Sequence, residues 1–425
     1  MLYYSDSQNK IYLGDALATL KQLPDASVQC CVTSPPYFGL RDYGVDGQIG
    51  LESTLKDYLA ALVAVFQEVR RVLRNDGVCF VNIGDSYAGS WGAQGRPQGD
   101  GQMADRSVVS ARQIHAHPKF EGLTGVRGRE SGLKPKDLMG VPWRLAFALQ
   151  DDGWFLRQDI IWRKLSPMPE SVRDRCTKSH EYIFLLSKSQ KYFWDYVGSQ
   201  EKATGEAAGN KTHKQQQQYA NGDRRHRIAA GLLDVEASET RNMRSVWSLA
   251  SYPLKEAHFA AFPPELVRRC LSAAVSPFGC CNQCGKPYVR ITKRERVATR
   301  PGLNTKVPPR ASAHEESPYN VQTIAGNRDP LRHVTRVLTI GSKQSCECIN
   351  SVSVPCTVVD IFHGAGTTMK VCQRLGLNYI GIELNPEYID LSLKRPDVKF
   401  PHEKHKATKR RKRGFIQRQF IGWEA

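Results

Sequence analysis

Residues 357–388 read TVVDIFHGAGTTMKVCQRLGLNYIGIELNPEY, and this stretch decides the fold class. An apolar strand ends at Asp360, a turn containing Gly364 and Gly366 follows, and a helix comes next. A second apolar strand, YIGIEL, ends at Glu383. A strand, a helix and a strand in this order form a parallel pair with the helix packed on one face of the sheet. Such sheets bind ligands beyond the carboxyl ends of their strands, so the loops that follow strands are the first candidates for a functional site.

Strands and helices alternate through most of the remaining chain. Residues 53–76 give the clearest helix, because leucine, valine and phenylalanine repeat there at helical spacing. Residues 27–34 (SVQCCVTS) are instead a continuous apolar run, which is typical of a buried parallel strand. Further strands are predicted at 10–15, 78–85, 154–162 and 180–187, and further helices at 16–23 and 136–150. The sequence therefore predicts an α/β fold with a doubly wound, mostly parallel sheet.

The composition points to a polyanionic partner. Of the 425 residues, 60 are Lys or Arg and 42 are Asp or Glu, which gives a formal net charge of +18. Such a balance favours nucleic acid, with a merely soluble basic protein as the alternative. No apolar run is long enough to cross a bilayer, and the N-terminus has no signal-peptide pattern. We therefore expect a cytoplasmic protein whose 12 cysteines are reduced.

The loop after the strand at 27–34 carries an unusual set of polar groups: Ser34, Pro35, Pro36 and Tyr37. The two prolines stiffen the loop and remove two N–H donors, which leaves carbonyl acceptors, a hydroxyl and an aromatic face. These groups suit a flipped base with an amino group, because the hydroxyl and a proline carbonyl can accept its two N–H bonds while Tyr37 stacks on the ring. The two acceptors would draw the amine nitrogen toward tetrahedral geometry, which localises its lone pair. The nitrogen could then attack the methyl group of a sulfonium compound. A purely structural Pro-Pro turn is the alternative.

The glycine turn near residue 364 predicts a nucleoside ligand. Glycines let the backbone turn tightly and approach a ligand closely. Glu383, at the tip of the next strand, is placed to accept hydrogen bonds from two ribose hydroxyls. The dinucleotide pattern G-x-G-x-x-G is absent, which points away from NAD and is compatible with S-adenosyl-L-methionine, a ligand without a phosphate. A turn with no ligand is again the alternative.

Both motifs resemble those of a known family. Ser34-Pro35-Pro36-Tyr37 resembles the catalytic motif of the DNA amino-methyltransferases, and residues 360–367 resemble their cofactor motif, D-P-F-x-G-x-G-T. The catalytic motif comes first, which is the order of the β class, in which the α/β fold is circularly permuted. Ile361 in place of the usual proline and His363 inside the glycine turn are departures from the pattern. The resemblance covers residues 10–90, 134–197 and 241–394.

The resemblance implies roles for individual residues. Catalysis would fall to Ser34, Pro35, Pro36 and Tyr37. Ser before Pro-Pro-Tyr is more usual among enzymes that methylate N4 of cytosine and Asp among those that methylate N6 of adenine, so cytosine is favoured and adenine stays open. Binding of S-adenosyl-L-methionine is expected to involve Asp15, Phe259, Pro263, Asp360, Phe362, Gly364, Gly366, Thr367, Glu383 and Asn385.

The resemblance also implies a domain organisation and partners. We expect a catalytic half at 1–197, with a mobile loop at 86–132, and a cofactor half at 243–277 and 351–397, with a basic tail at 398–425. Residues 198–242 are the candidate target-recognition segment, in which Arg224, Arg225 and Arg227 are expected to contact double-stranded DNA. Both polar segments, 86–132 and 198–242, are alternatively disordered linkers. The family further leaves room for a homodimer, for a cognate restriction endonuclease and for a nucleoid-associated protein of bacterial or phage origin.

Four cysteines in an insertion at 278–350 have the spacing of metal ligands. Cys281 and Cys284 form C-x-x-C, and Cys346 and Cys348 form C-x-C, with 62 residues from Cys284 to Cys346. Four thiolates predict a closed, structural Zn²⁺ site, with Cys280 as a competing ligand and free thiols as the alternative. The stretch between the pairs is expected to face either phosphates or solvent, and its basic residues include Arg290, Lys293, Arg294 and Arg296.

Two rival functions belong to other classes. The first is a zinc-containing DNA-binding protein without activity, against which the intact Ser34, Tyr37, Asp360 and Glu383 argue. The second is an RNA or protein-amide methyltransferase, a class that commonly has Asn where this chain has Ser34.

Overall fold

The computed structural model describes residues 1–39, 45, 47–88, 132–134, 136–203, 238–252, 262–298 and 333–396. Contacts divide the chain into two compact units. The first unit comprises Met1–Asp195, Arg244–Tyr288 and Gln344–Ile421, and the second comprises Tyr196–Met243, Val289–Lys343 and Gly422–Ala425.

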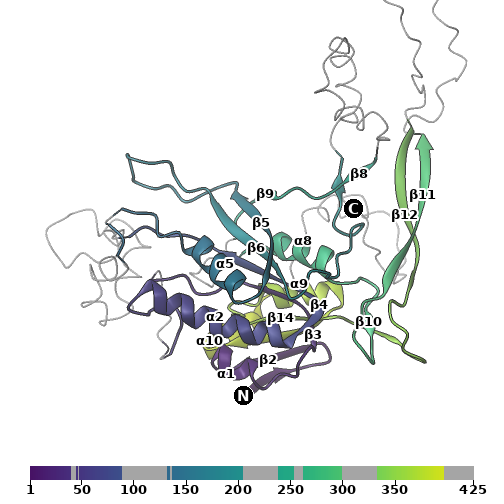
Figure 1. Ribbon diagram of the computed structural model, residues 1–425, viewed down its shortest axis with the longest axis horizontal. Helices are drawn as coiled ribbons and strands as arrows, with labels where there is room; N and C mark the ends of the chain where they lie inside the picture. Colours follow the sequence, from purple (N-terminus) through teal and green to yellow (C-terminus); the bar gives the residue numbers. More distant parts are fainter. Residues whose placement is uncertain are drawn as a thin grey trace, which may run out of the picture. The chain divides into compact units, whose positions relative to one another are not determined.

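The first unit is built on one central sheet (Figure 1). Within the described residues it has nine strands, in the order β1 (Leu2–Ser5), β2 (Asn9–Leu13), β15 (Asn378–Glu383), β14 (Thr357–Asp360), β3 (Val28–Thr33), β4 (Leu73–Ile83), β6 (His180–Ser187), β5 (Phe155–Lys164) and β9 (Val246–Leu249). The run from β2 to β4 is parallel throughout, and so is the pair β5–β9. The pairs β1–β2, β4–β6 and β6–β5 are antiparallel. The prediction of a mostly parallel α/β sheet is confirmed.

Helices cover both faces of this sheet (Figure 1). Cys31 of β3 packs into one apolar cluster with one layer of helices, whereas its neighbour Cys30 lies near cysteines of the other layer. Successive strand residues point to opposite faces, so both faces of β3 are buried, as its continuous apolar run requires. The first layer contains α1 (Ala16–Leu20), α2 (Leu55–Val72) and α5 (Val141–Asp151), and the second contains α8 (Pro264–Ala274) and α9 (Thr367–Leu375), while α10 (Pro386–Lys394) contacts β15 and β2.

Three predicted helix boundaries are wrong. The helix expected to reach residue 23 ends at Leu20. The helix expected to reach residue 76 ends at Val72, because Leu73 adopts an extended conformation with ψ 141° and begins β4. The helix expected from residue 136 begins at Val141, with Pro142 in its first turn, where a missing N–H costs no helical hydrogen bond. The start of α2 follows its cap, since the Thr54 hydroxyl accepts a hydrogen bond from the Asp57 N–H at 3.0 Å.

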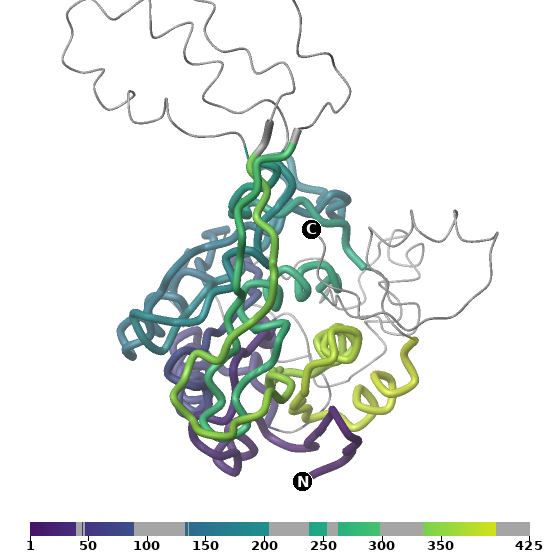
Figure 2. Tube along the Cα trace, turned by 90° about the vertical axis from the view of Figure 1, so that its right-hand side faces the viewer, coloured from purple at the N-terminus to yellow at the C-terminus, as the bar shows by residue number. Residues whose placement is uncertain are grey.

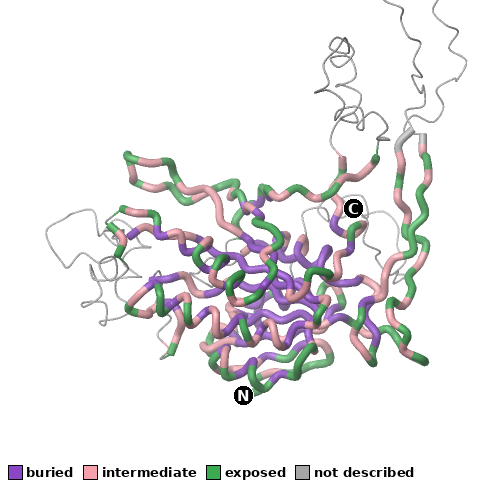
Figure 3. The backbone as a smooth tube through the Cα atoms, in the orientation of Figure 1, coloured by how far each residue is buried: buried purple, intermediate pink, exposed green. Residues whose placement is uncertain are grey.

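The second unit contains two strand pairs that the sequence did not predict. β7 (Glu201–Lys202) pairs with β8 (Thr240–Arg241), and β11 (Val289–Ala298) pairs with β12 (His333–Lys343). Figure 2 shows β11 and β12 running beside one another as a long ribbon. Figure 3 shows exposed and intermediate positions along both strands, whereas buried positions follow the central strands of the first unit. The basic stretch between the cysteine pairs therefore forms a β-ribbon at its two ends.

The first unit also holds a short pair, β10 (Cys280–Cys281) with β13 (Ser353–Val354). None of the helices in the described part of the chain has the length and apolar character needed to span a bilayer.

Candidate functional site

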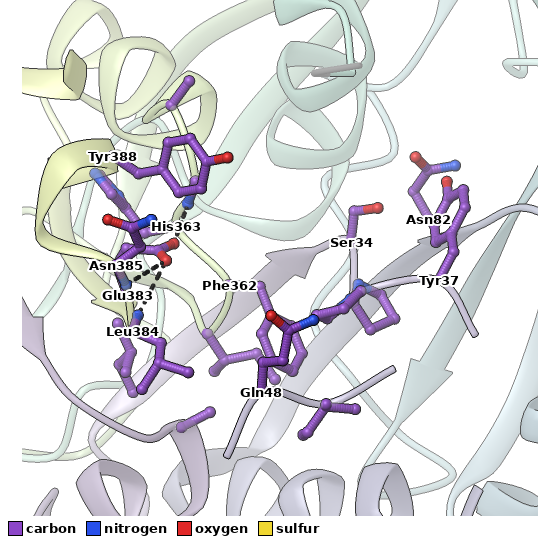
Figure 4. Close-up of a pocket in the computed structure, with 18 of the residues that line it drawn as sticks. Ser34, Tyr37, Gln48, Asn82, Phe362, His363, Glu383, Leu384, Asn385 and Tyr388 are labelled. Atoms are coloured by element: carbon purple, nitrogen blue, oxygen red, sulfur yellow. Dashed lines mark hydrogen bonds between the residues drawn. The ribbon is translucent and has the colours of Figure 1, made fainter. Parts of the chain in front are cut away.

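The carboxyl ends of β14, β15 and β3 open into one cavity of about 360 Å³, all of it within the first unit. The Ser-Pro-Pro-Tyr loop and the glycine turn both line this cavity, although they lie more than 300 residues apart in the chain. Figure 4 shows Glu383, Asn385 and Tyr388 at one end, Ser34 and Tyr37 at the other, with Phe362 and Gln48 between them. The two predicted strand-end pockets therefore share one cleft.

Asp360 links the two loops from within the core. Its buried carboxylate accepts hydrogen bonds from the hydroxyls of Thr33, at 2.8 Å, and Thr368, at 2.7 Å. The Phe362 N–H donates to the same group at 3.2 Å. Burial raises the pKa of Asp360 to about 7 in spite of these donors. Asp360 is not among the residues that line the cavity, and its predicted contact with a cofactor stays a prediction.

The glycine turn is held by a buried histidine. His363 Nδ1 lies 2.7 Å from the Tyr379 hydroxyl, and Nε2 lies 2.7 Å from the Ser392 hydroxyl. Burial lowers the pKa of His363 to about 3, so the ring is neutral. Gly366 has φ +72°, and a Cβ there would lie 2.6 Å from the Ser392 Cβ. The turn thus needs glycine both for its conformation and for the close approach of α10.

Glu383 presents a fixed acceptor to the cavity. Its carboxylate accepts hydrogen bonds from three backbone N–H groups, those of Gly364 at 2.7 Å, Leu384 at 3.0 Å and Asn385 at 2.9 Å. Burial raises the pKa of Glu383, and the three N–H donors oppose that rise. A carboxylate has about four acceptor positions, so capacity remains for a donor from a ligand.

The aromatic ring of Tyr37, in the Ser-Pro-Pro-Tyr loop, is held by a hydrogen bond at its hydroxyl and by close packing against Gly84. The Tyr37 hydroxyl donates to Glu181 Oε2 at 2.7 Å. A Cβ at Gly84 would lie 2.7 Å from Tyr37 Cε2, so only glycine leaves room for the ring in this position. The Tyr58 hydroxyl donates to the Pro36 carbonyl at 2.8 Å, which occupies one of the two acceptors that the prolines offer.

Sequence reasoning missed a polar group at the same end of the cavity. Glu181 also accepts hydrogen bonds from Lys164 Nζ at 2.5 Å and from Asn82 Nδ2 at 3.2 Å. Lys164 lies over the Trp162 ring, 5.1 Å from its centroid, and all four residues line the cavity. The sequence alone contains little indication of this polar group, because Lys164 and Glu181 are brought together by the antiparallel pairing of β5 with β6.

The remaining residues that were predicted to bind the cofactor or DNA either line the cavity, lie away from it, or fall outside the described part of the chain. Asp15 caps α1 by accepting from the Ala18 N–H, Asn385 caps α10 by accepting from the Glu387 N–H, and both line the cavity. Phe362, Gly364 and Thr367 line it as well, whereas Pro263 and Gly366 do not; Phe262, which was not predicted, does. The residues that lie outside the described part of the chain are Phe259, Arg224, Arg225 and Arg227.

The predicted cysteine ligands come together in the first unit. The four Sγ atoms of Cys281, Cys284, Cys346 and Cys348 all lie within 4.8 Å of one another. The Gln344 side chain donates to Cys346 Sγ at 3.2 Å. Cys280 is not part of this cluster and lies buried, with Sγ 3.8 Å from the Pro355 carbonyl.

A family model and the similar known proteins all indicate the same family, the DNA methylases. The sequence model of the DNA methylase family matches residues 28–281 and 345–394, which include both motif loops. The Type II methyltransferase M.XycI of Xanthomonas campestris pv. cyanopsidis is 37% identical over 385 residues, covering 91% of this chain and 86% of that protein. The Type II methyltransferase M.Cfr9I of Citrobacter freundii is 35% identical over the same shares. Among solved structures, the cytosine-N4-specific PvuII DNA methyltransferase has a TM-score of 0.47 at 15% identity, covering 95% of this chain and 92% of that one.

The raised pKa of Asp360 predicts a pH dependence of stability. Between the ordinary value of 3.8 and the folded value of about 7, the folded protein holds a proton that the unfolded chain has lost. The contribution of Asp360 to stability must therefore fall as pH rises through this range. We expect the free energy of unfolding of the wild type, minus that of Asp360→Asn, to decrease from about pH 5 to about pH 7 and to level off above about pH 8.

Urea denaturation of both proteins at each pH measures this difference, in which the titration of all other groups cancels. A difference that is flat or rises with pH would show that Asp360 stays ionised in the folded protein.

Proposed function

This chain belongs to the DNA methylase family, and from that premise we propose that it transfers the methyl group of S-adenosyl-L-methionine to the exocyclic amino group of a base flipped out of double-stranded DNA. The observation that carries the proposal is the single cavity lined by both Ser34 and Glu383. Its volume of about 360 Å³ is in the range of small-molecule sites. A base must therefore leave the duplex before its amino group reaches Ser34.

The end of the cavity around Glu383 would hold the methyl donor. The free acceptor capacity of the Glu383 carboxylate suits one ribose hydroxyl of a nucleoside, while Phe362 and Tyr388 add aromatic surface to the lining of the cavity. Gly364, with φ +52°, lets the backbone pass close to a ligand. S-adenosyl-L-methionine supplies an electrophilic methyl carbon when bound. Asp15 and Asn385, each held as a helix cap, extend the polar lining.

The end around Ser34 would hold the acceptor amine. The Ser34 hydroxyl accepts one amine hydrogen, and the Pro35 carbonyl is the better candidate for the second, because the Pro36 carbonyl already accepts from Tyr58. The ring of Tyr37, held by Glu181, gives the base a surface on which to stack. Two acceptors that draw the amine toward tetrahedral geometry raise its nucleophilicity, so positioning supplies most of the catalysis.

Cytosine N4 is the favoured acceptor, with adenine N6 as the alternative. Ser34 takes the place that Asp commonly has in the N6-adenine enzymes. Lys164 adds a second argument, because it lines the cavity and only one of its three N–H groups is directed to Glu181. Cytosine has two acceptors, N3 and O2, in a row beside its amino group. Adenine has only N1 there, followed by a C–H group, so a lysine donor directed to the position of O2 would discriminate in favour of cytosine.

Features of the family carry over as further parts of the proposal. The Ser-Pro-Pro-Tyr loop follows β3 and the glycine turn follows the neighbouring β14, with the catalytic motif first in the chain, which supports the circularly permuted β-class arrangement. The predicted domain ranges, the homodimer, the cognate endonuclease and the nucleoid association stay predictions.

A structural Zn²⁺ ion fits the cysteine cluster. A Zn–S distance of about 2.3 Å and tetrahedral coordination place the four sulfur atoms about 3.8 Å apart. This spacing is compatible with the structure, in which the four Sγ atoms lie within 4.8 Å of one another. Four thiolates close the coordination shell, so the ion would stabilise the fold around Cys281 and Cys346 without taking part in catalysis. The Gln344 amide, which donates to Cys346 Sγ, suits a charged thiolate.

The base is identified by mass spectrometry of nucleosides from DNA that the protein has methylated. We expect N4-methylcytosine, and we expect Ser34→Ala to lower kcat about 100-fold, because one positioned acceptor is lost. The dissociation constant for S-adenosyl-L-methionine should stay at the wild-type value. 5-Methylcytosine would refute the proposed chemistry, and N6-methyladenine would establish the alternative acceptor.

The position of the Tyr37 ring is tested by three variants. Tyr37→Ala should slow methyl transfer roughly 10- to 100-fold through lost stacking, while Tyr37→Phe, which keeps the ring, should retain most of the rate. Gly84→Ala should approach the loss of Tyr37→Ala, because its Cβ would displace the ring. Single-turnover rates and calorimetric titration with S-adenosyl-L-methionine separate transfer from donor binding. A wild-type rate for Gly84→Ala would contradict the assigned ring position.

Metal analysis tests the zinc site. The purified protein should contain one Zn²⁺ per chain, and Cys284→Ser should lose the ion and lower the unfolding midpoint. Cys176→Ser is the matched control, since Cys176 is exposed and outside the cluster. Protein free of metal with an unchanged midpoint would leave the four cysteines as thiols.

A further inference from the structure

The loop that joins β5 to β6, residues 165–179, leaves the sheet beside the Ser34 end of the cavity. β5 runs antiparallel to β6, and β6 runs antiparallel to β4, so β5 points in the same direction as β4 and β3. Lys164, the last residue of β5, lines the cavity, and so does Glu181 at the start of β6. The β5–β6 loop therefore projects from the same edge of the sheet as the Ser-Pro-Pro-Tyr loop.

Contacts within the first unit hold both legs of the β5–β6 loop. At its base, the Lys164 N–H donates to the Ser179 carbonyl at 2.8 Å. Farther out, an ion pair joins Arg175 to Glu170, and the Arg175 guanidinium lies over the Tyr87 ring, 4.0 Å from its centroid. Figure 1 shows the loop extending beyond the ends of both strands. These contacts hold the loop at its base and just behind its tip, residues 166–169.

The tip of the loop presents an apolar side chain to solvent. Met168 is 79% exposed and lies between Pro167 and Pro169, while Leu165, at the foot of the same leg, is 54% exposed. Pro167 has a fixed φ, and Pro169 restricts Met168 to extended conformations. The tip therefore loses little backbone entropy when a partner binds it, and it gains free energy when that partner covers the methionine.

The tip lies within a short reach of the cavity. Met168 is four residues from Lys164, and four extended residues span at most about 14 Å. A base that enters the Ser34 end must come from a duplex lying against this edge of the sheet, so the tip would face the place that the base has left. Arg173, on the return leg, is exposed, and its guanidinium suits a phosphate of the same duplex.

We propose that Met168 enters the base stack of duplex DNA and fills the gap left by the flipped base, with Leu165 packing behind it. Flipping requires unpairing and unstacking, and apolar side chains such as Met and Leu can insert between base steps. The unbranched, polarisable methionine side chain adapts to a gap of irregular shape. The inference rests on the proposed function, to which it adds the group that replaces the flipped base.

A second copy of this chain is the other apolar partner to consider. A stable protein interface buries about 800 Å² on each partner. Met168 and Leu165 offer two side chains on a narrow loop, with the charged Arg173 nearby, which is a much smaller surface. The gap of a single base is a closer match in size and makes duplex DNA the favoured occupant.

Two duplexes test the inserted side chain. Both carry the methylation site mapped on plasmid DNA, with the target base either paired or opposite an abasic position. Met168→Ala should lower the single-turnover rate about tenfold on the paired duplex and leave it near wild type on the other, where no base pair has to be broken. Met168→Leu should retain most of the rate. Ile349→Ala is the matched control, because it removes an equally exposed apolar side chain, at 80%, and should have the wild-type rate.

Each result has one reading. A wild-type rate for Met168→Ala on the paired duplex would overturn the insertion, and so would equal losses on both duplexes. A dimer that dissociates on Met168→Ala in sedimentation would assign the tip to a second copy. Unchanged unfolding midpoints and unchanged affinity for S-adenosyl-L-methionine exclude misfolding. Wild-type protein that methylates no DNA would refute the proposed function, whereas an active wild type with an unaffected variant would refute the insertion alone.

Discussion

The buried carboxylate of Asp360 is the contact on which the cavity depends. It binds Thr33, the residue before the Ser-Pro-Pro-Tyr loop, and Thr368, in the first turn of the helix that follows the glycine turn. A buried carboxylate without its donors is costly, so the hydrogen bonds hold the ends of β3 and β14 at one level. The parallel pairing of Cys30 with Val358 sets the same register from within the sheet. The proposed methyl transfer needs this fixed relation, because it requires the reacting atoms of donor and acceptor in line.

A second set of buried polar groups explains how a histidine fits inside the glycine turn. The Ser392 hydroxyl donates to the Ile389 carbonyl at 2.7 Å, so it must accept from His363, which places the ring proton on Nε2. Nδ1 then accepts from the Tyr379 hydroxyl. A Cβ at Gly381 would lie 2.7 Å from Nδ1, so this strand position needs glycine as well. The departure from the family pattern at His363 is thus a packed and fully hydrogen-bonded feature that ties the turn to β15 and α10.

The sequence predicted what depends on local pattern and missed what depends on pairing. The strand at 180–187 was predicted with its observed bounds, because its apolar run is continuous. Lys164 and Glu181 carry no such signal, since their meeting depends on the antiparallel register of β5 and β6. The strands β11 and β12 were missed because Lys and Arg obscure the alternation that marks a half-buried strand. For Asp360, the motif identifies the residue and predicts a contact with the ligand, whereas its buried hydrogen bonds to Thr33 and Thr368 became visible only in the structure.

The two ends of the cavity are built in different ways, and the difference suits their tasks. The Glu383 end is fixed by backbone donors and by glycines, so its shape follows from the fold. The Ser34 end depends on a chain of side chains from Tyr37 through Glu181 to Lys164. Side chains can turn within a lined cavity, so under the proposed function this end would admit a base and close around it. Under the proposed function, a base at this end would exclude water and strengthen the attraction between Glu181 and Lys164, because the effective dielectric constant would fall. Entry of the acceptor would therefore stiffen the very contacts that hold the Tyr37 ring, which makes the acceptor end most ordered when a base occupies it.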